Sequence, residues 1–125
     1  MQYIPKEKIE LHLKLGRNLC QFVKIGTYFE DRTFDWIKLE KEGDQYCATL
    51  VRSFDQGNEV FCDILEFETA NELDEDENPQ FKGEKEAVFE WLKNEFDINL
   101  EQFHAPKHLK EKYLELIENN LLGGQ

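Results

Sequence analysis

Apolar side chains occupy every second position near the start of the chain, at Ile9, Leu11, Leu13 and Leu15. Strict alternation that ends at a glycine is typical of a half-buried strand, and it predicts a strand over residues 8–16. A turn at 16–18 would then lead into a second strand over 19–26. The alternative is a single helix that begins after Pro5, and the pattern of residues 8–25 leaves this choice open.

The pattern is clearer between residues 33 and 68, where three runs are rich in β-branched and aromatic residues. Two short segments that contain glycine, "EGD" at 42–44 and "DQGN" at 55–58, separate these runs. Apolar runs joined by glycine turns of hairpin length predict an antiparallel meander. With the two strands before it, the sheet would have five strands.

The apolar period changes from two to about four after Pro79. Helical spacing recurs in 83–96 and again in 105–124, at Val88, Trp91, Leu92 and Phe96 and at Leu109, Tyr113, Leu116 and Ile117. Strands followed by helices favour an α+β fold. We therefore predict one α+β domain over residues 1–125, with two C-terminal helices packed on one face of the sheet.

The predicted strand pairing makes both faces of the meander apolar, so either both are covered or one is a recognition surface. Trp36 could be an exposed anchor for a partner on the second face. The first face places Arg52 between Asp35 and Asp63, and a turn at 43–44 would set Asp35 directly opposite Arg52. This cluster could bind an anionic group or orient a catalytic carboxylate, or it could be an ion pair that only satisfies its own charges.

Charge is unevenly distributed along the chain. The net charge is −12, and residues 66–101 hold 13 acidic and 3 basic residues, a net charge of −10 within that segment. Such a composition argues against direct binding of nucleic acid, because phosphates are neutralised by a basic surface. A concentrated acidic segment attracts a basic partner, although it can also be only a solvated face.

Other classes of site are not supported by the sequence. An EF-hand that begins at Asp74 would need glycine and glutamate where Pro79 and Lys85 stand. His104 and His108 are four residues apart, like the zinc pair of a metalloprotease helix, but Pro106 lies between them and no glutamate follows His104. No phosphate loop or nucleophile elbow is present. We expect no metal and no cofactor. The three cysteines, the absence of a long apolar run and the lack of a signal-like N-terminus predict a cytoplasmic protein that does not enter a membrane.

These features are typical of a small acidic protein that inhibits a basic partner, and we predict that it is not an enzyme. Immunity proteins that neutralise nuclease-like bacterial toxins belong to this type. The predicted partner-binding residues are Glu66, Glu68, Glu72, Asp74, Glu75, Asp76, Glu77 and Trp36. Two alternatives are a small-ligand or enzymatic domain that uses Asp35, Arg52 and Asp63, and a structural or adaptor subunit; the oligomeric state is left open.

Overall fold

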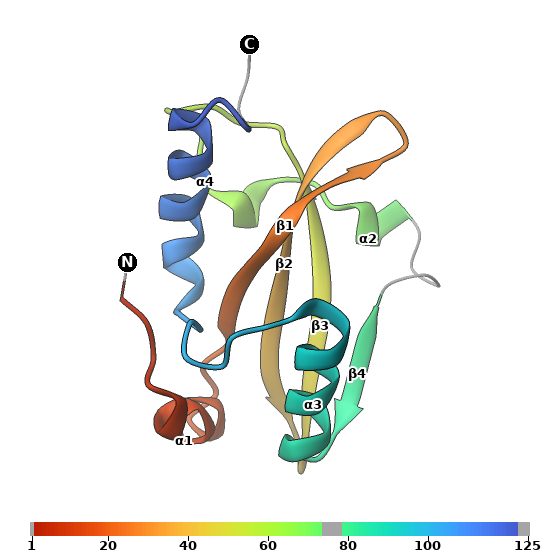
Figure 1. The fold of residues 1–125 in the computed structure, drawn as a ribbon, viewed down its shortest axis with the longest axis vertical. Coiled ribbons are helices and arrows are strands. Elements are labelled where there is room, and N and C mark those ends of the chain that lie inside the picture. Colours follow the sequence, from red (N-terminus) through yellow and green to blue (C-terminus); the bar gives the residue numbers. More distant parts are fainter. Residues whose placement is uncertain (1, 74–78, 123–125) are drawn as a thin grey trace.

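A four-stranded antiparallel sheet forms the centre of the computed structural model, which describes residues 2–73 and 79–122 (Figure 1). The strands are neighbours in chain order: β1 (Leu19–Tyr28), β2 (Asp31–Glu42), β3 (Gln45–Phe54) and β4 (Gln80–Gly83). The predicted α+β class and antiparallel meander are confirmed. The described residues contain four sheet strands rather than five.

Helices cover both faces of this sheet. Their bounds are η1 (Lys6–Lys8), α1 (Ile9–Lys14), η2 (Ile64–Glu66), α2 (Ala70–Leu73), α3 (Lys85–Phe96), η4 (Pro106–His108) and α4 (Leu109–Glu118). α1 and α3 pack on one face, while η2 and α4 pack on the other. The prediction that the two C-terminal helices share one face is wrong, because each apolar face of the sheet needs its own cover.

Two clusters of buried side chains form the core, one on each side of the sheet. The cluster under α1 and α3 contains Ile9, Leu13, Leu19, Ile37, Leu39, Tyr46, Ala48, Leu50, Val88, Leu92, Ile98, Leu100 and Phe103. The cluster under α4 contains Cys20, Phe34, Trp36, Ile64, Phe67, Leu109, Tyr113, Leu116 and Leu122. Burial of both clusters is the main stabilising term of the fold, since apolar surface removed from water contributes about 25 cal/mol per Å².

Residues 9–14 form a helix, so the predicted first strand is wrong. Ile9 and Leu13, four residues apart, are fully buried, whereas Leu11 and Leu15 are more than half exposed. An ion pair between Glu10 and Lys14 at 3.0 Å stabilises the outer face of this helical turn. The alternating apolar residues therefore include one buried pair at helical spacing, Ile9 and Leu13. The second predicted strand, over residues 19–26, lies within β1.

Residues 59–68 form no strand, so the third run of the predicted meander is also wrong, although the carbonyl of Glu68 at its end accepts a hydrogen bond from the N–H of Phe54 of β3 at 2.8 Å. The side chain of Asn58 accepts hydrogen bonds from the backbone N–H groups of Val60 and Phe61, at 2.8 and 3.0 Å. Asp63 similarly accepts from the N–H of Leu65 and begins η2. Local side-chain acceptors satisfy the backbone here and compete with a strand ladder.

The edge of β3 beyond β4 is closed by a side chain. The amide of Asn71 donates to the carbonyl oxygen of Leu50 at 2.9 Å and accepts from the N–H of Arg52 at 2.8 Å. Leu50 also donates its N–H to the carbonyl of Pro79 at 2.9 Å. Leu50 of β3 is therefore hydrogen-bonded both to Asn71 and to Pro79, which stand before and after the acidic part of the sequence.

No helix within the described ranges combines the length and apolarity that crossing a membrane requires.

Candidate protein-binding surface

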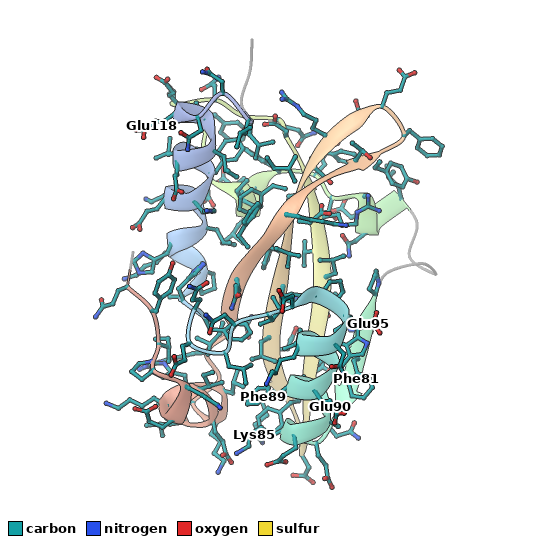
Figure 2. All side chains as sticks on the ribbon, in the orientation of Figure 1. Phe81, Lys85, Phe89, Glu90, Glu95 and Glu118 are labelled. Atoms are coloured by element: carbon teal, nitrogen blue, oxygen red, sulfur yellow. The ribbon has the colours of Figure 1, made fainter. Side chains whose placement is uncertain are left out.

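The acidic residues of the segment 66–101 are exposed wherever the structure describes them. These residues are Glu66, Glu68, Glu72, Glu84, Glu86, Glu90, Glu95, Asp97 and Glu101. Figure 2 shows Glu90 and Glu95 extending from α3 at the surface. Within residues 2–73 and 79–122, only Glu86 of this group lies in an ion pair, at 3.8 Å from Lys85. The segment thus carries carboxylates that the described part of the protein does not neutralise.

Basic residues inside the segment pair mainly with acids outside it. Lys82 on β4 lies 2.7 Å from Glu42 on β2, and Lys85 on α3 lies 2.9 Å from Glu10 on α1. Hydrogen bonds from Lys85 and Lys14 lower the pKa of Glu10 to about 2. Two of the segment's three lysines are thus held at short distance by acids outside the segment, which leaves most of its negative charge uncompensated.

Large apolar side chains are exposed beside the first acids of this segment. Val60 is 93% exposed, Leu73 67%, Leu65 51% and Phe61 43%. Each of these side chains exposes apolar area whose burial against a partner would be stabilising. We call these four apolar residues and the exposed glutamates near them in the chain the acidic–apolar surface, which comprises Glu59, Val60, Phe61, Leu65, Glu66, Glu68, Glu72 and Leu73.

The chain that carries this surface is fixed to α4. The hydroxyl of Tyr113, on α4, donates a hydrogen bond to the carboxylate of Asp55 and accepts one from the N–H of Gly57 at 3.2 Å. Burial and the hydrogen bond to Asp55 raise the pKa of Tyr113. Asp55 also lies 3.3 Å from Arg32 of β2. These contacts hold residues 55–57 against the sheet, so that the residues after them are presented from a fixed base.

A glycine is required at position 57 by close packing. A Cβ atom there would overlap the carbonyl oxygen of Phe61 and the ring of Phe67. The rings of Phe61 and Phe67 lie 5.0 Å apart, and Phe67 in turn packs at 5.4 Å from Tyr113. One half-exposed aromatic residue of the acidic–apolar surface is therefore continuous with the buried cluster under α4.

The predicted partner-binding residues divide into three groups. Glu66, Glu68 and Glu72 are exposed, as a binding surface requires. Asp74, Glu75, Asp76 and Glu77 lie outside the described residues. Trp36 is only 4% exposed and donates its indole N–H to the hydroxyl of Ser53 at 3.0 Å, so it is a core residue rather than a surface anchor.

The alternative cluster is only partly assembled. Asp35 lies directly opposite Arg52, and the Nε of Arg52 is 3.9 Å from Oδ1 of Asp35. The observed turn at 43–44 is the one that sets these two residues opposite each other. Asp63 is absent from this cluster, because it lies in the segment before η2. Burial raises the pKa of Asp35, and the hydrogen bond from Thr33 opposes that effect.

The exposed apolar residues and the unpaired state of the acids were not predicted from the sequence. The pattern predicts a sheet strand that includes Val60, Phe61 and Leu65, and it does not separate them from the residues that are buried. Within the described residues, no group of three histidine, cysteine or acidic side chains could hold a metal ion. No protein-family model, curated protein or solved structure matches this chain.

Proposed function

We propose that this protein inhibits a basic protein by binding it through the acidic–apolar surface, as an immunity protein neutralises a nuclease-like bacterial toxin. The single observation that carries the proposal is the set of exposed, unpaired carboxylates in the segment 66–101. Such carboxylates would take the place of phosphates in a basic, substrate-binding cleft. Their field would steer a basic partner and speed its association at low salt.

The exposed apolar residues support this proposal by supplying a second kind of contact. Carboxylates at an interface mainly set the association rate and its dependence on salt, whereas desolvated apolar side chains mainly set the dissociation rate. Val60 and Leu73 are the most exposed apolar residues of the acidic–apolar surface. A partner would bury them between the charged positions.

The experiment begins with affinity capture from the native cell at low salt, using the full chain as bait. The recovered basic protein is then purified and its binding is measured by stopped-flow and surface plasmon resonance. In the variant with Glu66, Glu68 and Glu72 replaced by glutamine, the association rate should fall about tenfold at low salt. At about 1 M salt the two rates should converge, since the Debye length is then only about 3 Å.

A matched control removes three acids from elsewhere on the surface. Glu7, Glu30 and Asp31 are also exposed and lie in no ion pair in the described chain, so replacing them by amides changes the net charge equally, from −12 to −9. The control should associate at nearly the rate of the unmodified protein. Equal losses in both variants, or no basic partner at low salt, would refute the proposal.

A separate double variant tests how much the exposed apolar residues contribute to binding. Replacing Val60 and Leu73 by serine should raise the dissociation rate at least about tenfold and leave the association rate within about twofold. Inhibition is measured with the same partner, as loss of its activity in vitro and as protection of cells that express it. A partner that binds this surface but keeps its full activity would support an adaptor role instead.

A further inference from the structure

The sheet face under α3 carries a charged row where the helix no longer covers it. α3 ends at Phe96, and the following residue, Asp97, adopts a left-handed conformation that turns the chain away. Figure 1 shows α3 lying over the lower part of the sheet only. Beyond its end, three residues lie side by side across β1, β2 and β3: Lys24, Asp35 and Arg52.

The carboxylate of Asp35, at the centre of this row, already has a hydrogen-bond donor and an ion-pair partner within the protein. Asp35 is 1% exposed, and its Oδ1 accepts a hydrogen bond from the hydroxyl of Thr33 at 2.6 Å. Its Oδ2 lies against Gly26, where a Cβ would overlap it. Arg52 supplies the opposite charge from the neighbouring strand. One carboxylate therefore stands between two cations, and the row has an excess of one positive charge.

Both cations are accessible from outside. Arg52 is positioned by a hydrogen bond to the carbonyl of Thr27 and by the ring of Tyr28, 5.7 Å from its guanidinium carbon. These contacts fix the direction of its guanidinium group, which keeps 27% side-chain exposure. Lys24 is exposed and has no hydrogen-bond or ion-pair partner in the described chain. Its ammonium group is the uncompensated charge.

These residues line a pocket of about 600 Å³, within the range that small-molecule sites occupy. The polar side is formed by the charged row, and the apolar side by Leu50, Pro79 and Phe96. A pocket with a cationic floor and apolar walls suits a ligand that carries an anionic group on an apolar body. The location is distinctive, because the rest of this protein is strongly acidic.

We propose that this pocket binds a small organic anion, a carboxylate or a phosphate monoester, whose anionic group contacts Lys24 and Arg52. Its apolar body would lie against Phe96 and Pro79. Asp35 would act as a positioning residue, because its ion pair with Arg52, at 3.9 Å, helps to hold the guanidinium group beside the pocket. This activity is independent of the protein partner proposed above, since it uses none of the residues of the acidic–apolar surface.

The test is a titration of the ¹⁵N-labelled full chain, followed by amide chemical shifts, with phenyl phosphate and benzoate as probes. Benzyl alcohol and benzylamine serve as neutral and cationic counterparts, and inorganic phosphate as an anion without an apolar body. We expect saturable shifts at Gly26 and Thr27 with a Kd of about 1 mM or tighter for at least one aromatic anion. Inorganic phosphate should bind at least about fivefold more weakly, and the neutral and cationic probes should not saturate.

Two variants decide the role of the charge. Lys24→Met should weaken binding of the anionic probe about tenfold, whereas Lys107→Met, at another exposed lysine outside the pocket, should leave it unchanged. Circular dichroism checks that both variants are folded. The proposal is overturned if no aromatic anion saturates these shifts, if benzyl alcohol binds equally well, or if Lys24→Met binds like the unmodified protein.

Discussion

Replacing Tyr113 by phenylalanine removes one hydroxyl from the contact between α4 and the acidic–apolar surface. The ring would keep its packing against Phe34 and Phe67, at 6.2 and 5.4 Å. The loss is a hydrogen bond to the carboxylate of Asp55, worth about 1.5–3 kcal/mol for a charged acceptor. The buried N–H of Gly57 also loses its acceptor, at a cost of about 1–3 kcal/mol.

Because the two terms overlap and the site can partly relax, we expect the free energy of unfolding to fall by about 3 kcal/mol in total. For a chain of 125 residues, this corresponds to a decrease in Tm of about 10 °C. Urea denaturation followed by tryptophan fluorescence gives the free energy, and an unchanged m-value would indicate that the compactness of both states is preserved. Hydrogen exchange at the amide of Gly57 should accelerate.

Tyr46→Phe is the matched control, because Tyr46 is also buried but its hydroxyl has no hydrogen bond among the described residues. This variant should lose less than about 0.5 kcal/mol. If Tyr113→Phe loses no more than the control, the hydroxyl does not fix residues 55–57. A large loss of stability with unchanged exchange at Gly57 would likewise refute the reasoning.

Three further substitutions follow from the structure. Gly57→Ala should cost about 2 kcal/mol or more, because its Cβ would overlap the ring of Phe67, whereas Gly83→Ala, with ordinary contacts only, should change Tm little. The pKa of Asp35 is raised above its ordinary value of 3.8, so native Asp35 holds its proton more tightly than the unfolded chain does. Its contribution to stability should therefore decrease as pH rises above 3.8, and urea denaturation of Asp35→Asn across this range should lack that decrease. Burial lowers the pKa of His104 below 6.5, so stability should fall as pH drops below 6.5; His104→Gln should be less pH-dependent there, and an equal slope would contradict this.

The elements with strong periodicity were predictable from the sequence. β2, β3, α3 and α4 lie where the apolar period indicated. The two apolar faces of the predicted sheet left two possibilities open, and the structure has both faces covered. Side-chain periodicity reports which residues are buried, and in these elements burial follows one regular face. It does not report which helix covers which face, since that depends on the path of the connections.

Two elements could not be predicted, one because local hydrogen bonds override the apolar pattern and the other because it is too short for its period to be recognised. Residues 59–68 have strand-like composition, but Asn58 and Asp63 satisfy the backbone locally. In α1, alternation hid the helical pair Ile9 and Leu13, and the left-handed Gly16 follows the end of that helix. Short elements of this kind contain too few residues for the period to decide between helix and strand.

The candidate sites were predictable to different degrees. Charge counts located the acidic segment, and of the two turns considered the one at 43–44 places Asp35 opposite Arg52, as observed. Lys24 was missed because β1 is irregular between Phe22 and Lys24. Without that β-bulge Val23 would lie opposite Asp35 and Lys24 would lie on the other face of the sheet. An inserted residue of this kind reverses the side-chain alternation and leaves no mark in the apolar pattern.

The Asn71 side chain that closes the edge of β3 also bears on self-association. An open strand edge is a template on which another copy of the chain can add a strand, and such addition leads to aggregation. The amide of Asn71 occupies the groups of Leu50 and Arg52 that an incoming strand would use. The neighbouring carboxylate of Glu72 adds repulsion between like-charged copies. We therefore expect Asn71→Leu to aggregate at concentrations at which the unmodified protein stays dispersed in light scattering, because a leucine side chain cannot occupy the backbone groups of that edge.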